Sequence, residues 1–181
     1  MDGFTALQTD RLILRRWRES DRPPFAAMNA DLEVMRYFTK PLTRSESDAF
    51  VDRIERHFQE HDWGLWALER RDTAEFIGFT GLWPATIEAP FTPAVEVGWR
   101  LRRSAWGHGF ATEAAKAAIA DGFDRVRIPE IVSFTASLNE RSWRLMERLG
   151  MRRVEGGDFD NPSVPVGQAH RRHVLYRFAP P

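Results

Sequence analysis

Residues 94–124 most constrain the fold, because they join an apolar strand to an alanine-rich helix through a turn of small residues. The pattern predicts a strand at Ala94–Leu101, a turn at Trp106–Ala111 and a helix that opens at Thr112. Glycines let a ligand approach the backbone closely, since they lack a Cβ. The first helical amides have no intrahelical partner and lie at the positive end of the dipole. This segment therefore predicts a cradle for a pyrophosphate, although its glycines alone also fit an ordinary strand-to-helix turn.

Two well-known phosphate loops do not match this turn. The sequence has no Gly-x-x-x-x-Gly-Lys-Ser/Thr run, and the dinucleotide fingerprint Gly-x-Gly-x-x-Gly fails at Thr112. The turn resembles the pyrophosphate loop of the GCN5-related N-acetyltransferases (the GNAT family), Gln/Arg-x-x-Gly-x-Gly/Ala, on Trp106, Gly109 and Ala111. Trp106 departs from Gln or Arg but matches the branch that resembles the ribosomal-protein N-terminal acetyltransferases (RimJ/RimL-like).

Composition narrows the classes of protein to consider. A length of 181 residues suits one domain with a sizeable core. Because 26 basic residues balance 26 acidic ones, we expect neither a nucleic-acid nor a membrane partner. The absence of cysteine excludes a disulfide framework and a thiol nucleophile. Residues 1–5 do not begin a secretory signal, and no apolar run approaches the roughly 20 residues of a membrane span, so we expect a cytoplasmic protein.

The rest of the chain predicts a series of strands and helices separated by polar or Pro-rich turns. Strands are expected at Arg11–Trp17, Leu65–Leu68, Phe76–Trp83, Ile131–Thr135, Met151–Val154 and His173–Phe178. Helices are expected from Ser20 through Met28 toward Tyr37, from a cap at Ser45 and Asp48 through Phe58, and over Glu140–Leu149. Pro84–Pro93 is expected to be a loop, because its prolines cannot serve a ladder.

This order of elements favours one α/β domain with a mixed, largely covered sheet. It is also the order of the GNAT family, so the resemblance covers about residues 11–178 of a single N-acetyltransferase domain over 1–181. The resemblance implies a GNAT fold: a mixed, mostly antiparallel sheet of about seven strands, flanked by helices and splayed at the fourth and fifth strands.

A second family motif, Asn-x-x-Ala/Ser-x-x-x-Tyr-x-x-x-Gly-Phe, is similar to the run from Asn139 to Met151. Met146 stands where the family often has a tyrosine that protonates the departing thiolate, so that general acid is missing. In the N-terminal acetyltransferase branch, a serine at the place of Ser142 is the usual substitute. Asn139 is also a good helix N-cap without any ligand, and Ser142 also fits a solvated helix position.

The resemblance implies acetyl-coenzyme A (acetyl-CoA) as co-substrate and no metal. Gly98 predicts a bulge or a close backbone approach, and a bulge would free amides for the pantetheine arm. The backbone of residues 99–101 would pair with that arm like an added strand. Arg102 and Arg103 either add charge near the phosphates or are solvated surface residues. The expected cofactor-binding residues are Trp99, Arg100, Leu101, Trp106, Gly107, His108, Gly109, Phe110, Ala111, Thr112 and Asn139.

The chemistry implied is direct transfer of the acetyl group from the thioester to a primary amine. Alkylamines are mostly protonated at neutral pH, so a base must remove a proton. Glu96 is the candidate base, because burial among apolar neighbours would raise its pKa, and Ser142 is the second catalytic candidate. The alternative for Glu96 is a structural or acceptor-binding carboxylate. The histidines have no spacing that makes a convincing metal site.

The identity of the acceptor is the least constrained part of the prediction. The resemblance favours a protein or peptide N-terminus, and small amines also fit; a homodimer is an open alternative to a monomer. A competing hypothesis is a non-catalytic acyl-CoA-binding sensor with the same fold, favoured by the loss of the tyrosine at Met146. The expected acceptor lining is aromatic and acidic: Tyr37, Phe38, Trp66, Trp83, Asp158, Phe159 and Asp160.

Overall fold

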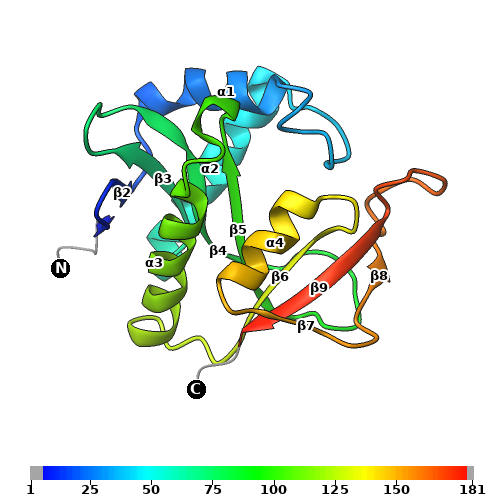
Figure 1. The fold of residues 1–181 in the computed structure, drawn as a ribbon. Helices are drawn as coiled ribbons and strands as arrows, with labels where there is room; N and C mark the ends of the chain where they lie inside the picture. Colours follow the sequence, from blue (N-terminus) through cyan, green and yellow to red (C-terminus); the bar gives the residue numbers. More distant parts are fainter. Residues whose placement is uncertain (1–5, 179–181) are drawn as a thin grey trace.

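The computed structural model describes residues 6–178, so residues 1–5, on which the expectation of no secretory signal depends, lie outside it. Figure 1 shows how the described elements follow one another along the chain. The helices are α1 Arg22–Ala30, α2 Arg44–His61, α3 Phe110–Asp124 and α4 Glu140–Arg148. The strands are β1 Ala6–Gln8, β2 Leu12–Arg15, β3 Leu65–Arg70, β4 Phe76–Pro84, β5 Val95–Leu101, β6 Ile131–Ala136, β7 Arg152–Arg153, β8 Phe159–Asp160 and β9 Arg172–Phe178.

The strands form one mixed sheet in the order β1-β2-β3-β4-β5-β6-β9-β7, with β8 also paired to β9. Every pair is antiparallel except β5 with β6, which confirms the expected α/β fold with a mostly antiparallel sheet. The sheet has nine strands where we expected about seven. The additional strands, β1 and β8, are too short for an alternating pattern to reveal them.

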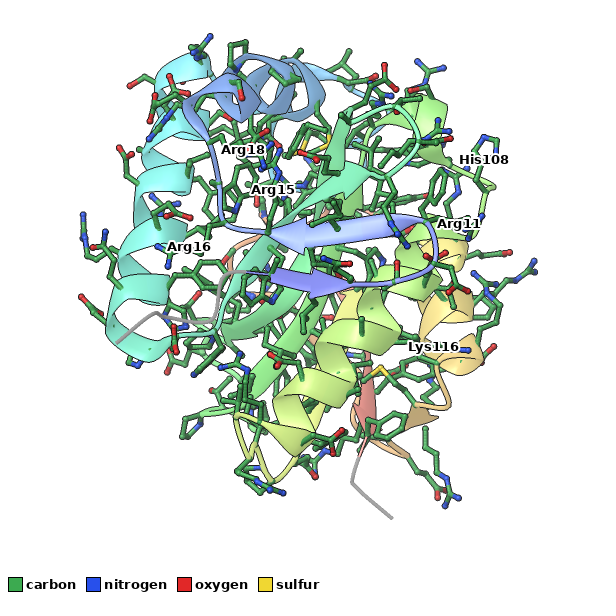
Figure 2. All side chains as sticks on the ribbon, turned by 90° about the vertical axis from the view of Figure 1, so that its left-hand side faces the viewer. Arg11, Arg15, Arg16, Arg18, His108 and Lys116 are labelled. Carbon is green, nitrogen blue, oxygen red and sulfur yellow. The ribbon has the colours of Figure 1, made fainter. Side chains whose placement is uncertain are left out.

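Helices cover both faces of this sheet. Figure 2 shows α2 on one side of the sheet and α3 with α4 on the other. On the α1/α2 side, Phe25 and Phe50 pack against Phe79 of β4, and Trp17 packs against Phe25. On the α3/α4 side, α3 presents alanines and Ile119 to Val97 of β5. The apolar stripe of each helix is buried because it meets one face of the sheet.

The observed helix boundaries correct three expectations. The cap of α2 is Thr43, whose hydroxyl accepts from the Glu46 N–H while the Glu46 carboxylate accepts from the Thr43 N–H, so Ser45 and Asp48 are not the capping pair. Helix α1 ends at Ala30 and does not continue to residue 37. Helix α3 begins two residues early, because Gly109 with φ of 79° forms its N-cap.

Gly98 forms no bulge, so the first of the two alternatives predicted for it is wrong. It pairs in regular register with Gly81, and the register shift in this part of the sheet lies at Leu68/Glu69 of β3. Pro84, which we expected outside the ladder, is the last residue of β4 and lies opposite Val95. A terminal position tolerates proline because the ladder ends there.

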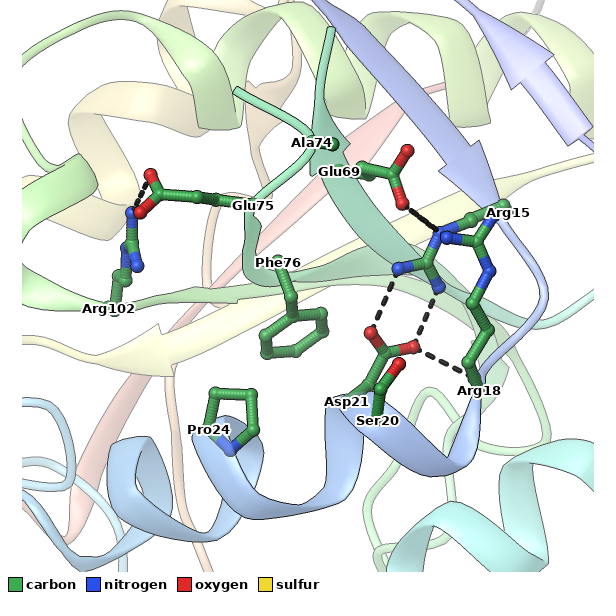
Figure 3. Close-up of a pocket in the computed structure, with 10 residues that line it drawn as sticks. All are labelled: Arg15, Arg18, Ser20, Asp21, Pro24, Glu69, Ala74, Glu75, Phe76 and Arg102. Atoms are coloured by element: carbon green, nitrogen blue, oxygen red, sulfur yellow. Dashed lines mark hydrogen bonds and ion pairs between the residues drawn. The ribbon is translucent and has the colours of Figure 1, made fainter. Parts of the chain in front are cut away.

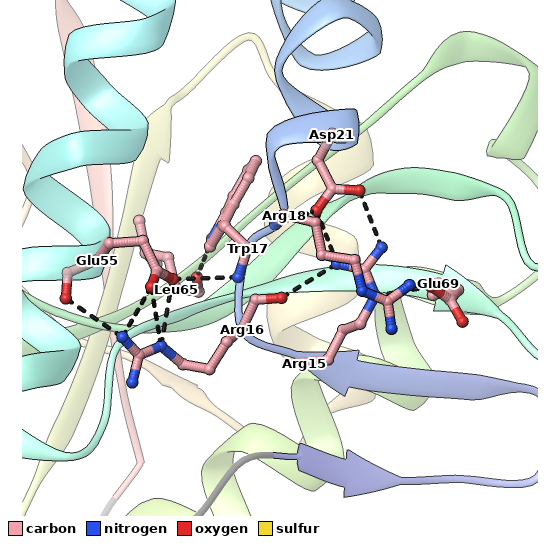
Figure 4. Close-up of polar contacts among 8 residues, drawn as sticks. All are labelled: Arg15, Arg16, Trp17, Arg18, Asp21, Glu55, Leu65 and Glu69. Atoms are coloured by element: carbon pink, nitrogen blue, oxygen red, sulfur yellow. Dashed lines mark hydrogen bonds and ion pairs between the residues drawn. The ribbon is translucent and has the colours of Figure 1, made fainter.

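A buried ion network ties β2, β3 and the start of α1 together (Figure 4). The Arg15 guanidinium donates to both oxygens of Asp21 and to Glu69, and all three side chains are at most 10% exposed. Arg18 adds a second donor to Glu69 from the surface. Because each buried charge has an opposite partner, this cluster is a structural clamp. None of the helices in residues 6–178 combines the length and the apolar character that crossing a bilayer requires.

Candidate active site

The central feature of the site is a crevice between β5 and β6. These parallel strands pair only at Val95 with Ile131 and at Glu96 with Val132, and beyond these pairs they diverge. One side-chain bond closes the apex, where the Ser133 hydroxyl donates to the Val97 carbonyl at 2.9 Å. The strands therefore part near the start of β5. A ligand can enter the gap at the carboxyl ends of the strands.

The divergence leaves one edge of β5 without a strand partner. The Val97 carbonyl accepts from Ser133 and the Leu101 carbonyl from the Trp106 indole at 2.8 Å, so odd-numbered residues point their backbone groups toward the crevice. Trp99 lies between them and directs its N–H and C=O into the open gap. Arg100 faces β4, where it pairs with Phe79, so its backbone does not reach this edge. The geometry thus favours Trp99 and Leu101 for pairing with an extended ligand.

The glycine turn lies at the start of α3. Gly107 and Gly109 both have φ of 79°, a left-handed conformation that favours glycine. The first intrahelical bond is from the Glu113 N–H to the Gly109 carbonyl, which leaves the amides of residues 110–112 without a helical partner. A Cβ added to Gly107 would meet nothing within 4 Å, so open space adjoins this backbone. These features fit a pyrophosphate cradle.

A clamp that sequence patterns did not reveal holds this turn in place. Arg11, in the tight turn between β1 and β2, donates to the His108 carbonyl at 2.9 Å and pairs with Glu113 at 2.6 Å (Figure 2). Thr9 donates to the same Glu113 carboxylate at 2.6 Å. The Arg11 guanidinium also lies over the Phe110 ring. These contacts join residues about a hundred positions apart, so no local pattern could indicate them.

Helix α4 forms the other wall of the crevice. Its Arg141 guanidinium stacks 3.9 Å from the centre of the Trp106 ring and so connects α4 to the glycine turn. Asn139 precedes α4 and donates to Thr135 at 3.0 Å, and its side chain makes no capping bond. Ser142 lies half-buried in the first turn of the helix. In the described part of the chain, no side-chain bond engages the Ser142 hydroxyl, which leaves it available as a donor.

Met146 belongs to the core. It is 1% exposed and packs with Leu145 and Leu149 against the sheet. The sequence therefore lacks the family's usual tyrosine, and the methionine in its place cannot reach a ligand. Tyr176 of β9 is also buried, and its hydroxyl donates to Glu147 on α4.

Glu96 occupies the apex of the crevice, as the last residue of β5 that pairs with β6. Its side chain lies on the α1/α2 face of the sheet, because it faces Trp83 across the ladder and Trp83 packs against Phe50 and His57 of α2. Burial raises the pKa of Glu96 to about 8. Among residues 6–178 its carboxylate has no hydrogen-bond or ion-pair partner. Such a carboxyl is suited to exchange a proton near neutral pH.

Glu96 and Ser142 lie on different walls of the crevice and make no contact with one another. Glu96 projects from β5, whereas Ser142 projects from α4. A general base and a proton donor for the leaving group act on different atoms of an acyl-transfer reaction. The Glu96 side chain lies on the α1/α2 face of the sheet, whereas α4, which carries Ser142, lies on the opposite face.

The expected acceptor lining is only partly brought together. Trp66 is 1% exposed and stacks on Phe58 in the core, so it cannot line an open site. Asp158 is paired with Arg153, and Asp160 lies within ion-pair distance of Arg171 and Arg172, which neutralise the acidic loop. Phe38 and Trp83 remain on the α1/α2 face beside β5.

The two arginines expected near the phosphates are engaged elsewhere. Arg102 pairs with Glu75 at 2.7 Å, and Arg103 lies 3.9 Å from Asp31. Arg102 and Glu75 line a hollow of about 320 Å³ together with the Arg15 network (Figure 3). The charges in this hollow are already paired with one another. Within residues 6–178, no three His, Cys, Asp or Glu side chains are grouped to hold a metal ion.

Comparison with known proteins agrees with this geometry. A family model described as an acetyltransferase (GNAT) domain matches residues 11–152. YoaA of Bacillus subtilis, an uncharacterised N-acetyltransferase, is 30% identical over 152 residues, which cover 83% of this chain and 84% of YoaA. A GNAT-family acetyltransferase from Bacillus anthracis superposes with a TM-score of 0.78 at 22% identity, covering 97% of this chain and 98% of that one. RimL, a ribosomal alpha-N-protein acetyltransferase solved with coenzyme A, has a TM-score of 0.76 at 17% identity, with 96% and 97% covered.

Proposed function

Since the chain belongs to the GNAT acetyltransferase family and is an acyltransferase, we propose that it transfers an acetyl group from acetyl-CoA directly to a primary amine. The observation that carries this proposal is the crevice between β5 and β6, with an anion cradle at its mouth and an unpaired carboxyl at its apex. The free backbone groups of Trp99 would pair with the pantetheine arm, and the turn at residues 107–112 would hold the pyrophosphate. Asn139, which donates to Thr135 of β6, would lie beside this path.

Glu96 is proposed as the base that accepts a proton from the amine. A carboxyl with a pKa of about 8 matches an α-amino group, whose reference pKa is about 7.7–8.0, so this proton transfer is close to thermoneutral. Transfer from a lysine-type amine, with a reference pKa of about 10.4, is uphill by roughly 2.4 units, or about 3 kcal/mol. The site therefore favours an α-amine, whether of a protein N-terminus or of a small molecule, in line with the RimJ/RimL-like branch.

The reaction forms a bond between the amine nitrogen and the acetyl carbonyl carbon, and the carbon–sulfur bond of the thioester breaks. The amine gives one proton to Glu96 before attack, and the nitrogen of the adduct loses a second proton to solvent. The departing thiolate receives a proton from solvent, either directly or through Ser142, which then regains its proton from solvent. A thiolate whose conjugate thiol has a reference pKa of about 8.5 is a good leaving group at neutral pH. Protonation by Ser142 therefore contributes less to the rate than proton removal by Glu96. Met146 adds nothing at this step, because it is buried.

The first test is binding of acetyl-CoA to the purified protein by thermal shift and calorimetry. A ligand at a hundredfold excess over its dissociation constant stabilises the fold by about 2.7 kcal/mol, so we expect a clear rise in Tm. ATP and NAD serve as matched nucleotide controls. A response to either of these and none to acetyl-CoA would contradict the proposal.

The second test separates the enzyme from a non-catalytic acyl-CoA sensor, which the loss of the tyrosine at Met146 favours. Thiol release is measured over a panel of N-terminal peptides, amino acids and polyamines. We expect turnover that rises with pH through about 8 and a Glu96→Gln variant that binds acetyl-CoA normally but turns over slowly. Binding of acetyl-CoA without thiol release for any amine would identify the sensor.

A further inference from the structure

The α1/α2 face of β5 presents three residues in alternation beside the crevice. Glu96, Gly98 and Arg100 share this face, since side chains two apart on a strand point the same way. A Cβ added to Gly98 would meet no atom within 4 Å. An open space therefore lies on the sheet between an unpaired carboxyl on one side and a guanidinium on the other.

Arg100 has an environment unlike that of a surface arginine. Its guanidinium lies 4.1 Å from the centre of the Phe38 ring and 5.4 Å from that of Phe79. Nη1 donates to the Asn29 side-chain oxygen at 2.6 Å, and Asn29 is itself fixed by a bond to Ser47. The group is therefore held flat and in one orientation.

This guanidinium has no anionic partner. Its Nε is buried without a hydrogen-bond acceptor, and across residues 6–178 no carboxylate forms an ion pair with it. Burial lowers the pKa of Arg100 to about 10, and no nearby carboxylate counteracts that effect. The buried Arg15, by contrast, is bonded to two carboxylates. Arg100 is half-buried, and its guanidinium lies between two rings without a carboxylate partner, an arrangement that suits an anion from outside the chain.

We propose that the acceptor is an amine that also carries a carboxylate, which Arg100 binds while Glu96 faces the amine. The proposal rests on the acetyl transfer proposed above. A guanidinium with free N–H groups matches a carboxylate closely, and Phe38, 41% exposed, leaves the face open to a ligand. Phe79 and Trp83, opposite Arg100 and Glu96 on β4, offer apolar contact to the part of the acceptor between its two charges.

The spacing along β5 sets the size of this acceptor. The Cα atoms of Glu96 and Arg100 are separated by four residues of strand, or about 13 Å. The amine and carboxylate of an α-amino acid are roughly 3 Å apart, so both side chains have to lean inward to bind the two groups at once. An acceptor whose carboxylate is several bonds from its amine spans the same distance without that inward lean. Two sources have this chemistry: a small amino acid with a remote carboxylate, and a peptide N-terminus followed by an acidic side chain.

The experiment uses matched acid and amide probes on the full chain saturated with coenzyme A. One arm compares 6-aminohexanoate with 6-aminohexanamide, and the other compares Ala-Glu-Ala-Ala with Ala-Gln-Ala-Ala, both as C-terminal amides. Calorimetry gives the dissociation constants, and thiol release from acetyl-CoA gives KM and kcat. We expect the acid of at least one pair to bind about tenfold more tightly than its amide. The arm that shows the preference identifies the source.

Arg100→Gln should remove this preference by weakening the acid probe about tenfold and leaving the amide unchanged, with the effect in KM and not in kcat. Arg100→Lys should restore part of it, because the charge returns without the planar fork. Arg102→Gln is the control, because the Arg102 guanidinium pairs with Glu75, and this variant should keep the preference. A purely structural role for Arg100 would affect acid and amide equally.

Two outcomes overturn the inference: equal binding of acid and amide in both arms, including no binding of either, or a preference for the acid that persists in Arg100→Gln. Failure of the proposed function is distinguishable from these. In that case the acid probe binds in an Arg100-dependent way while thiol release stays absent, so the anion site stands and the acetyl transfer does not.

Discussion

At the scale of single residues, Glu96 shows how an unfavourable environment can serve chemistry. Its carboxyl lies at the apex of the crevice without a partner among the described residues, and burial raises its pKa to about 8. A raised pKa means that the folded state prefers the protonated form. A base with such a pKa therefore lowers the stability of the fold at the pH where it becomes active.

Glu96→Gln should stabilise the protein in a pH-dependent manner. The wild-type carboxyl has an ordinary pKa of 4.5 and a folded-state value of about 8, so the fold loses stability as the pH rises between them. The amide does not ionise, so the Tm of the variant minus that of wild type should grow from about pH 5 to about pH 9. Thermal melts across this range measure it. Glu88→Gln, at an exposed position, is the control. A difference in Tm between Glu96→Gln and wild type that does not change with pH would contradict the raised pKa of Glu96.

At the scale of elements, the amino end of α3 is positioned by contacts from outside the helix. The helix begins at a left-handed Gly109 without a side-chain cap, so its first amides stay free. Arg11 fixes the turn from the neighbouring β1–β2 connection, and Arg141 fixes Trp106 from α4. The free amides are therefore held rigidly where an anion can reach them.

Gly109→Asp and Gly109→Asn form a matched pair for this element. Both residues tolerate a positive φ and both would bring a Cβ to 3.4 Å from the Arg11 guanidinium, so they differ mainly in charge. If the pyrophosphate lies at the turn, the aspartate variant should bind acetyl-CoA about tenfold more weakly than the asparagine variant, since about 1.4 kcal/mol of repulsion suffices. Calorimetry with both folded variants decides it. Equal affinities would move the phosphates elsewhere.

At the scale of the whole molecule, Arg15 and Arg100 lie on one face of the sheet and differ in whether carboxylates neutralise their charge. The Arg15 network joins β2, β3 and α1 on one side of the sheet, and each of its buried charges is compensated. Arg100, on the same face further along the sheet, is not compensated by any carboxylate in the described part of the chain. The Arg15 network is thus fully paired, whereas Arg100 has no carboxylate partner among the described residues.

Arg15→Met should destabilise the fold by about 3–5 kcal/mol, because it leaves Asp21 buried without a counterion and leaves Glu69 with only the exposed Arg18. Arg18→Met is the control: it also touches Glu69, but it is 59% exposed and should cost less than about 1 kcal/mol. Urea denaturation gives the free energy of unfolding of both variants. The affinity for acetyl-CoA should stay unchanged in each. A loss no larger for Arg15 than for Arg18 would show that the cluster is not a structural clamp.

The sequence alone determined the family, the order of elements and the glycine turn, because these depend on local periodicity and short motifs. The segment from Ala94 to Thr112 carries a strand, a turn and a helix start in one continuous run, and the structure places them there with a shift of two residues at α3. Glu96 could also be identified from the sequence, since a carboxylate inside an apolar strand is unusual. The short strands β1 and β8 could not be predicted, because they form only by pairing with other strands.

Tertiary structure alone decided which groups are paired and which are free. Three examples depend on residues distant in sequence. Arg11 binds His108 and Glu113, Arg102 pairs with Glu75, and Trp66 is buried. The alternation of side chains along a strand is enough to predict that Glu96, Gly98 and Arg100 share one face. It does not show that Arg100 has no carboxylate partner among the described residues. Charge in a protein has its effect through its neighbours in space, and a linear pattern does not specify them.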